Sequence, residues 1–319
     1  MRAVFLDLQS LDDLDLQPLR SVVSELVCHQ QTAVADVLDR IRGFDIVITN
    51  KAVLTAETIA QSDSLKLICV VATGVNNVDL DAAKQRDIPV CNCQGYGTSS
   101  VAQHVFSLML ALHTRLLDYH KAVGEGRWNR SEQFCLLDYP IQELQGKTLG
   151  LVGYGNLGRK VAEIARAFGM KVLVAQRPGA EPTQADDSRL PLNEMLPLVD
   201  VLSLHCPLTD ATRNLIDARA LRLMKPGSFL INAARGGIVD EPALVSALRE
   251  GHLAGAATDV LLEEPPRHGN PLLEPDIPNL IVTPHCAWGS FQARSTIIAQ
   301  AAENIHAFLE QGSPSRRVV

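Results

Sequence analysis

A glycine-rich segment has the residue types and spacing needed to bind a pyrophosphate. It follows the pattern G-x-G-x-x-G and consists of Gly153, Tyr154, Gly155, Asn156, Leu157 and Gly158. The first glycine permits a tight turn, the second lets the backbone approach a pyrophosphate, and the third lets a helix pack closely on a strand. The apolar run 148–152 predicts a strand before the motif, residues 159–168 predict a helix after it, and 171–174 predict the next strand. Because the helix N-terminus favours phosphate, this order predicts a dinucleotide site.

An arginine, two carboxylates and a histidine each follow an apolar run in the second half of the chain. They are Arg235 after Phe229–Asn232, Glu263 and Glu264 after Ala254–Asp259, and His285 after Leu280–Thr283. Taken singly, Arg235 could equally be a surface cation, Glu264 a solvated turn residue and His285 a core histidine with satisfied hydrogen bonds. Ligands of open α/β sheets bind outside the carboxyl ends of the strands, however, so all of these side chains could meet there. Their occurrence beside a dinucleotide motif favours a common site.

The elements that would position these residues alternate between strands and helices. The first half predicts strands at 3–6, 44–48, 67–71 and 88–91 and a helix at 80–85, and the second half predicts strands at 149–152, 172–174, 201–205, 229–232, 254–259 and 280–283. At 319 residues, with 46% hydrophobic but only 4% aromatic residues, the chain predicts two domains whose cores are filled by aliphatic side chains. This alternation is typical of parallel, doubly wound sheets.

Two helices stand out from the alternation. From Ser99 the apolar residues Val101, Val105, Leu108, Met109 and Leu112 recur every three or four positions, with Thr98 as N-cap. This stripe exceeds what one domain face needs, which predicts that the helix lies in a homodimer interface. The last helix spans 291–311 and ends at Gly312.

Composition argues against several classes of protein. The net charge is −7 without a basic patch, which argues against nucleic acid as the main partner. The N-terminus predicts a strand rather than a secretion signal, and no apolar run is long enough to span a membrane. Seven scattered cysteines favour a reducing cytoplasm over a disulfide framework. Cys91 and Cys93 lack a second pair at a ligand spacing, so we expect no metal site.

The chain resembles D-isomer-specific 2-hydroxyacid dehydrogenases over almost its whole length. The segments that match the family's motifs in order are 152–158, 204–209, 232–240, 257–265 and 283–290. Residues 72–79 and 284–288 are most similar to the glycerate dehydrogenase and hydroxypyruvate reductase branch. The resemblance implies two Rossmann-like or flavodoxin-like domains with a cleft between them. The substrate domain would comprise 1–98 and 286–319, and the NAD(P) domain 99–285.

The resemblance also implies roles for individual residues. His285 would donate the proton in keto-acid reduction, Glu264 would fix its tautomer and favour its charged form, and Arg235 would hold the substrate carboxylate. Glu264 is chosen over Glu263 because the family's acid stands at that spacing from Asp259. The other expected substrate residues are Lys51, Thr73, Gly74 and Trp288. The other expected cofactor residues, besides those of the glycine motif, are Val101, Gln176, Arg177, Cys206, Pro207, Thr212, Ala233, Ala234 and Asp259.

One position departs from the pattern of NAD-specific sites. Those sites usually end the second strand with an acidic residue that binds the ribose 2′-hydroxyl, whereas this chain has Gln176 followed by Arg177. A neutral glutamine removes repulsion against a 2′-phosphate and the arginine could pair with it, which favours NADP use. Alternatively, Arg177 points to solvent and NAD binds with weaker ribose contacts.

Several functions remain open from the sequence. The leading one is NAD(P)H-dependent reduction of hydroxypyruvate or glyoxylate to D-glycerate or glycolate. Alternatives are a 3-phosphoglycerate or other D-2-hydroxyacid dehydrogenase and a non-catalytic NAD(H)-sensing protein, against which the presence of Arg235, Glu264 and His285 argues. A formate dehydrogenase is disfavoured, since the resemblance implies Gln at position 264 in that branch, whereas this chain has Glu264.

Overall fold

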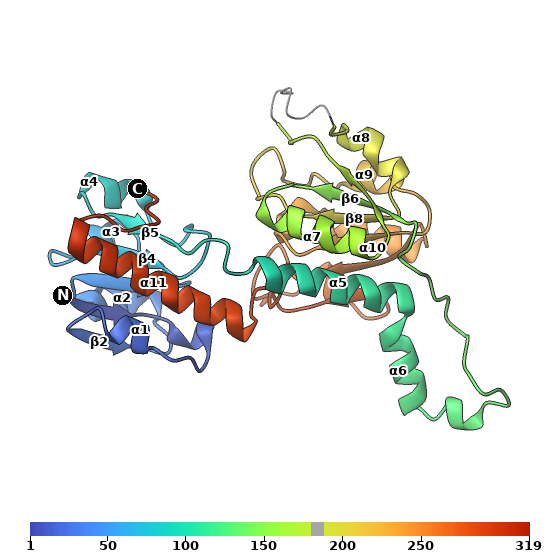
Figure 1. Cartoon of the computed structure of the whole chain (residues 1–319), viewed down its shortest axis with the longest axis horizontal. Coiled ribbons are helices and arrows are strands. Elements are labelled where there is room, and N and C mark those ends of the chain that lie inside the picture. Colours follow the sequence, from blue (N-terminus) through green and yellow to red (C-terminus); the bar gives the residue numbers. More distant parts are fainter. Residues whose placement is uncertain (180–187) are drawn as a thin grey trace. The chain divides into compact units, whose positions relative to one another are not determined.

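The protein, described here by a computed structural model over residues 1–179 and 188–319, divides into two compact units. Unit 1 comprises Met1–Gly97 and Trp288–Val319, and unit 2 comprises Thr98–Ala287 (Figure 1). Within these residues the strands of both sheets pair in parallel, and one isolated antiparallel bridge joins Cys91 to Arg317. The predicted pair of doubly wound α/β domains is thereby confirmed.

Unit 1 is built on a five-stranded sheet with the order β2-β1-β3-β4-β5. Its strands are β1 (Arg2–Phe5), β2 (Glu25–Cys28), β3 (Ile46–Thr49), β4 (Leu67–Val70) and β5 (Val90–Cys91). This is the flavodoxin-like order, in which the chain reverses direction across the sheet between β1 and β3. The carboxyl ends of β1, β3 and β4 therefore meet at one edge.

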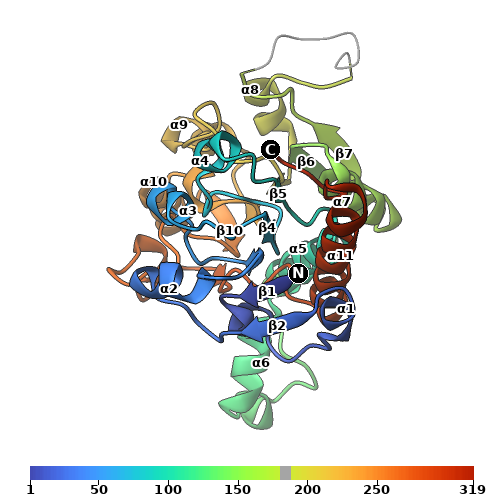
Figure 2. The ribbon, with the colours of Figure 1, turned by 90° about the vertical axis from the view of Figure 1, so that its left-hand side faces the viewer.

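Helices cover both faces of the unit 1 sheet (Figure 2). They are α1 (Gln17–Arg20) and α11 (Phe291–Gln311) on one face, and α2 (Val37–Ile41), α3 (Ala56–Ala60) and α4 (Leu80–Gln85) on the other. The C-terminal helix has the predicted bounds, because Ser290 caps its first turn and Gly312 adopts a left-handed conformation with φ 73° at its end. Its buried residues include Ile297 and Ile305.

Unit 2 is built on a six-stranded sheet with the order β11-β10-β9-β8-β6-β7. Its strands are β6 (Thr148–Val152), β7 (Lys171–Val174), β8 (Val201–Leu204), β9 (Ser228–Asn232), β10 (Leu253–Thr258) and β11 (Leu280–Val282). The neighbours of β6 are β7 and β8, so the strand order reverses at β6. Ligands of such sheets bind beyond the carboxyl ends of the strands at this point.

The unit 2 sheet is also covered on both faces. One face carries α5 (Thr98–Thr114) and α7 (Asn156–Ala167), and the other carries α8 (Leu192–Met195), α9 (Ala218–Leu223) and α10 (Glu241–Arg249). A further helix, α6 (Leu116–Gly124), and a short 3-10 helix at Trp128–Arg130 extend away from the sheet (Figure 1).

The apolar stripe of α5 corrects one expectation. Val105, Leu108 and Met109 are buried in the core between α5, α7 and the sheet, and Val101 packs against the same core. The stripe is therefore used inside unit 2 and does not by itself indicate a second subunit. Exposed apolar residues lie instead on α6 and the segment after it; they are Leu116, Leu117, Val123, Trp128, Phe134, Leu137 and Ile141.

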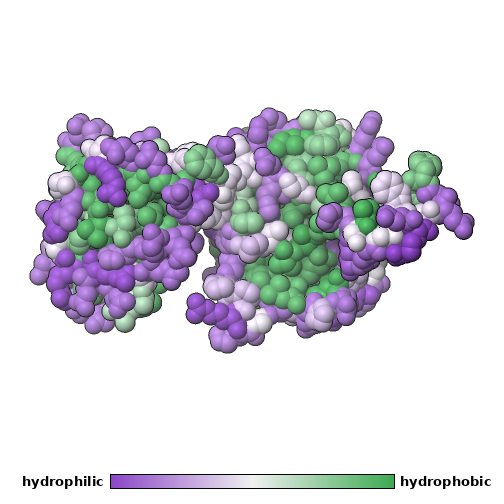
Figure 3. Space-filling view, turned by 90° about the horizontal axis from the view of Figure 1, so that it is seen from below, coloured by the Kyte–Doolittle hydropathy of each residue, from purple (hydrophilic) through white to green (hydrophobic). Residues whose placement is uncertain are grey.

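Figure 3 colours one face of the molecule by hydropathy, and hydrophobic side chains are seen on both units in this view. Within the part of the chain that the structure describes, no helix is both long and apolar enough to cross a membrane.

Candidate active site

The glycine motif forms the turn between β6 and α7. Gly153 has φ +99°, and a Cβ on it would lie 2.5 Å from the backbone carbonyl carbon of His205. A Cβ on Gly158 would lie 2.2 Å from the carbonyl oxygen of Gly153, so close packing of helix and strand requires this glycine as well. A Cβ on Gly155 would meet nothing within 4 Å, and no side chain caps the helix at this residue.

This turn fits the pyrophosphate of a dinucleotide. Its first and third glycines are required by the fold, whereas the second leaves open space beside the N-terminus of α7. The first N–H groups of that helix, including those of Asn156 and Leu157, form an anion-binding end. At the end of β7, Gln176 is partly buried and its N–H donates to Leu190 O at 2.8 Å, and Arg177 is exposed.

His285 and Glu264 form a hydrogen-bonded pair. The distance between His285 Nδ1 and Glu264 Oε2 is 2.6 Å, and each side chain is 33% exposed. Since a carboxylate accepts, Nδ1 carries the proton and Nε2 is left to face a reactant. His285 has φ +52°, a conformation uncommon for a non-glycine residue, and its N–H donates to the carbonyl oxygen of Asp259 at 2.7 Å. The backbone of the β10 loop therefore fixes the position of the ring.

The environment of Glu264 keeps its carboxylate ionised. Partial burial alone would raise the pKa of Glu264, but the hydrogen bonds from His285 and from Leu261 N–H, together with the charge of Arg235, lower it overall. The Leu261 N–H donates to Oε1 at 2.8 Å. One carboxylate oxygen therefore anchors the side chain to its own loop while the other holds the imidazole.

Arg235 stands at the end of β9 and its side chain is exposed. Its Nη1 donates to Ala234 O at 2.6 Å, and its charge acts on Glu264. The following residue, Gly236, approaches the β10 loop so closely that a Cβ would lie 2.0 Å from the Leu261 carbonyl carbon. This close approach brings the loops that carry Arg235 and Glu264 together.

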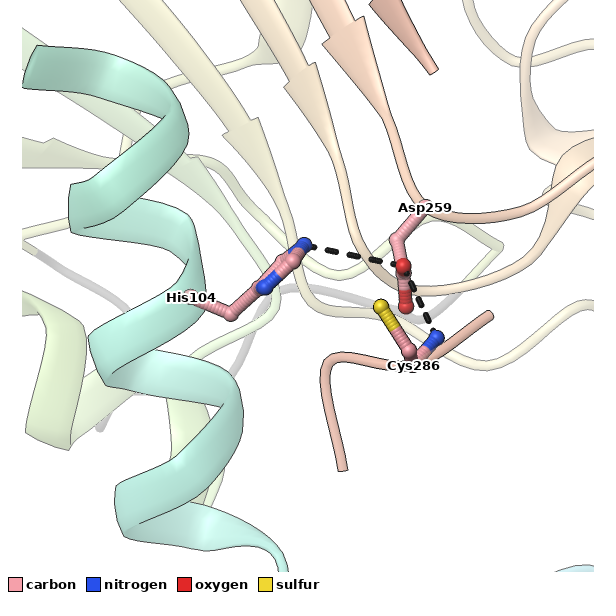
Figure 4. A group of neighbouring side chains, drawn as sticks. All are labelled: His104, Asp259 and Cys286. Atoms are coloured by element: carbon pink, nitrogen blue, oxygen red, sulfur yellow. Dashed lines mark hydrogen bonds and ion pairs between the residues drawn. The ribbon is translucent and has the colours of Figure 1, made fainter. Parts of the chain in front are cut away.

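Asp259 is the centre of a second cluster, with His104 from α5 and Cys286 from the loop after β11 (Figure 4). It is 1% exposed, and its Oδ1 accepts from Thr283 Oγ1 at 2.6 Å and from Cys286 N–H at 3.0 Å. Its Oδ2 accepts from Ala287 N–H at 2.8 Å, and His104 Nε2 lies 3.6 Å from Oδ1. Ligand atoms of His104, Asp259 and Cys286 lie within 4.8 Å of one another, as a metal would need. Both carboxylate oxygens already accept protein donors, so the geometry is that of a hydrogen-bond network which fixes the segment after His285.

The loop after β8 carries further predicted cofactor residues. Cys206 is buried and burial raises the pKa of its thiol to about 11, so the thiol is neutral. Thr212 Oγ1 donates to Pro207 O at 2.7 Å and accepts from Thr209 N–H at the same distance. This hydroxyl therefore holds the loop together. Burial also lowers the pKa of His205 to about 4, and its Nε2 lies 2.9 Å from Ser203 Oγ.

The remaining predicted residues lie where backbone contacts fix them. Ala233 and Ala234 follow β9, and the N–H of Ala234 donates to Asn232 Oδ1 at 3.1 Å. Val101, in the first turns of α5, packs against the core and is partly buried. These residues position the strand ends through packing and backbone hydrogen bonds rather than through reactive groups.

The four predicted substrate residues other than Arg235 and His285 belong to unit 1. Lys51 follows β3, and Thr73 and Gly74 follow β4, at the carboxyl edge of the unit 1 sheet. Thr73 Oγ1 donates to Cys93 O at 3.1 Å. The Trp288 ring packs edge-on against Tyr96, with the centroids 6.4 Å apart.

Two polar residues that lie beside predicted site residues, Asp7 beside Lys51 and His104 beside Asp259, were not identified from the sequence. Asp7, 8% exposed, accepts from the N–H groups of Asn50 and Ala52, both at 2.8 Å, and also from that of Lys51. It follows β1, so the strand-end rule that identified Arg235 would have found it. His104, which lies 3.0 Å from Thr283 Oγ1, has no comparable signal because it lies within the repeat of a long helix.

Comparison with known proteins agrees with this geometry. A family model described as D-isomer specific 2-hydroxyacid dehydrogenase, NAD binding domain, matches residues 106–287. A glycerate dehydrogenase from Methylorubrum extorquens is 42% identical over 318 residues, which are 99% of this chain and 98% of that protein. A hydroxypyruvate reductase from Blautia hydrogenotrophica is 36% identical over 320 residues, covering 98% of each chain. An NADPH-dependent glyoxylate/hydroxypyruvate reductase from Sinorhizobium meliloti, solved with citrate, is similar in structure with a TM-score of 0.83, 27% identity and coverage of 100% and 97%.

Proposed function

The chain belongs to the D-isomer specific 2-hydroxyacid dehydrogenase family and is an NAD(P)-dependent oxidoreductase, and from this premise we propose that it reduces hydroxypyruvate or glyoxylate. The observation that carries the proposal is the pair of His285 and Glu264 beside Arg235 at the carboxyl edge of the unit 2 sheet. The names of the full-length relatives support the choice of substrate.

His285 acts as the proton donor in the proposed reaction. The bound nicotinamide supplies the hydride that reaches the carbonyl carbon of the substrate. His285 transfers the proton on Nε2 to the carbonyl oxygen; hydride and proton together convert the carbonyl group to an alcohol, and the ring is left neutral. Glu264 holds Nδ1–H, so the ring keeps Nε2 toward the reactant and its charged form is stabilised before the transfer.

Arg235 binds the substrate carboxylate in the proposed complex. Its guanidinium offers paired donors in a plane, which matches two carboxylate oxygens. The proposed contacts of unit 1 with the substrate are the backbone N–H groups of Thr73 and Gly74 for its carboxylate, and Lys51 and Trp288 for the CH₂OH group of hydroxypyruvate. Asp259 orients the carboxamide of the nicotinamide. Unit 1 is then the substrate domain and unit 2 the cofactor domain.

NADPH is the proposed preferred cofactor. Gln176 stands where an acidic residue would repel a 2′-phosphate, and the exposed Arg177 can pair with that phosphate.

We also propose a homodimer, supported by the exposed apolar residues of α6 and the segment after it. A cytoplasmic location is supported by seven free cysteines.

The test of the proposed function is a panel of 2-keto acids assayed with NADH and NADPH. We expect hydroxypyruvate and glyoxylate to be reduced faster than pyruvate. His285→Ala should lower kcat by about 10²–10⁴ without abolishing cofactor binding, because only the proton donor is lost. His268→Ala is the matched control: His268 lies 2.9 Å from Glu263 in the same loop but is 84% exposed. Normal turnover in His285→Ala would contradict the mechanism, and faster reduction of pyruvate would contradict the substrate.

A further inference from the structure

The carboxylate of Asp7 holds the turn that follows β3 in unit 1. Its Oδ1 accepts from the N–H of Asn50 at 2.8 Å, and its Oδ2 accepts from the N–H of Ala52 at 2.8 Å and from that of Lys51. Three successive backbone N–H groups therefore point at one carboxylate. Asp7 is buried, and a buried carboxylate is costly unless it is hydrogen-bonded, so the turn and the carboxylate satisfy each other.

Side-chain contacts also hold the residues on either side of Lys51. Asn50 Nδ2 donates to Ser10 Oγ at 2.8 Å, and the carbonyl oxygen of Ala52 accepts from Asn77 Nδ2 at 3.0 Å. Asn50 and Ala52 are buried, whereas Lys51 between them is exposed. The turn thus presents one exposed cationic side chain on a backbone that is fixed from both sides.

The place of this turn in the sheet is that of a ligand site. Asp7 follows β1 and Lys51 follows β3, and these two strands are the neighbours between which the strand order of unit 1 reverses. Ligands of open α/β sheets bind beyond the carboxyl ends of the strands at this point. A lysine that only adds surface charge gains nothing from a fixed backbone, whereas a lysine that contacts a ligand loses less conformational freedom on binding.

We propose, on the premise of the proposed function, that Asp7 is a positioning residue through which the enzyme selects hydroxypyruvate over glyoxylate. Asp7 fixes the backbone of Lys51, so that the ammonium group donates to the hydroxyl oxygen of the CH₂OH group of hydroxypyruvate. Glyoxylate carries a hydrogen atom in place of that group and cannot make this contact. In this role Asp7 touches neither substrate nor cofactor and acts through Lys51.

The test is kcat/KM of the full chain for hydroxypyruvate and for glyoxylate at a saturating concentration of the reduced cofactor. Asp7→Asn keeps the size of the side chain but replaces one acceptor oxygen by an NH₂ group, which repels the N–H groups of the turn. We expect kcat/KM for hydroxypyruvate to fall by about tenfold or more, mainly through a higher KM, because Lys51 contacts a group that does not react. For glyoxylate we expect a fall of about threefold at most, since no contact with Lys51 is lost.

A double variant separates positioning from a merely structural role. Lys51→Met should lower the ratio of kcat/KM for hydroxypyruvate to that for glyoxylate by about tenfold or more. Asp7→Asn/Lys51→Met should then have the same ratio as Lys51→Met alone, because Asp7 acts through that lysine. If Asp7 were only structural, its loss would affect both substrates equally and would leave the ratio unchanged.

Asp45→Asn is the matched control. Asp45 precedes β3, at the opposite end of the strand from the turn, and its carboxylate also holds the chain by accepting from the N–H of Arg2 at 2.8 Å. The ratio should be unchanged in this variant. Should Asp7→Asn fail to fold, Ser10→Ala decides in its place: it removes the hydroxyl that holds Asn50 and should lower the ratio by about threefold.

The outcomes distinguish this role of Asp7 from the proposed function. A ratio that falls in Lys51→Met but is unchanged in Asp7→Asn, or in Ser10→Ala in its place, would overturn the role of Asp7 and leave the proposed function intact. A ratio that is unchanged in Lys51→Met would overturn the role of Asp7 together with the assignment of Lys51. A wild type that reduces neither keto acid would overturn the proposed function, and the role of Asp7 with it.

Discussion

At the scale of single residues, the charge of Glu264 sets the pH range of the proposed proton transfer. Because its pKa is lowered, Glu264 stays ionised even when the pH falls somewhat below the ordinary pKa of a carboxyl group. Its stabilisation of the charged His285 ring is therefore present above this lowered pKa and is lost as the pH falls through it. Glu264→Gln keeps an oxygen acceptor but removes the charge. We expect the decline of reduction with rising pH to begin at lower pH in this variant than in the wild type.

The measurement is kcat/KM for keto-acid reduction against pH. Glu263→Gln is the matched control, because Glu263 is the adjacent carboxylate and faces His268 rather than His285. Its profile should superimpose on that of the wild type. A profile of Glu264→Gln that also superimposes would mean that Glu264 only holds the ring in place.

Arg177 allows a test of cofactor choice at one residue. An arginine–phosphate contact contributes about 1.5–3 kcal/mol, or roughly ten- to a hundredfold in affinity. Arg177→Ala should therefore weaken NADPH and leave NADH nearly unchanged. Gln176→Asp should restore preference for NADH by repelling the 2′-phosphate and accepting from the ribose. The ratio of kcat/KM for the two cofactors measures both effects.

Lys171→Ala, at an exposed lysine where β7 begins, is the control for a change of surface charge. An unchanged NADPH/NADH ratio in Arg177→Ala would identify Arg177 as a surface cation.

At the scale of elements, one glycine of the turn between β6 and α7 is needed for folding and another for cofactor binding. A Cβ on Gly158 would lie 2.2 Å from the Gly153 carbonyl oxygen, so Gly158→Ala should lower Tm. A Cβ on Gly155 would meet nothing within 4 Å of the protein. Gly155→Ala should therefore keep the Tm of the wild type, yet weaken NAD(P)H by about tenfold or more because the methyl group obstructs the pyrophosphate. Thermal unfolding and cofactor titration on both variants check this contrast.

Elements were predictable from sequence where an apolar run matched a buried strand. The runs of unit 2 gave β6 to β11 nearly to the residue: β6, β8, β9 and β10 are central parallel strands buried on both faces, and the edge strands β7 and β11 are also short apolar runs. β2 was not predicted: it is a sheet-edge strand like β7, but no motif marks where it must lie, whereas the glycine motif and its helix fix where β7 follows. Spacing along the chain placed Arg235, Glu264 and His285 at strand ends. It could not show that Gly236 brings two of their loops into contact, which depends on tertiary packing.

At the scale of the whole molecule, the exposed apolar residues of α6 and its following segment lead to a prediction about assembly. Phe134 is 90% and Leu137 73% exposed, although burial of such side chains contributes about 1.5–3 kcal/mol each. Several exposed apolar residues gathered on one segment are typical of a subunit interface. We expect the protein to sediment as a dimer at micromolar concentration, and the double variant Phe134→Asp/Leu137→Asp to shift it toward the monomer. Val34→Asp, at an isolated apolar residue of unit 1 that is 65% exposed, should remain dimeric. A wild-type monomer at that concentration would rule out the dimer, whereas a dimer that persists in the double variant would place the interface elsewhere on unit 2, for example along the hydrophobic face seen in Figure 3.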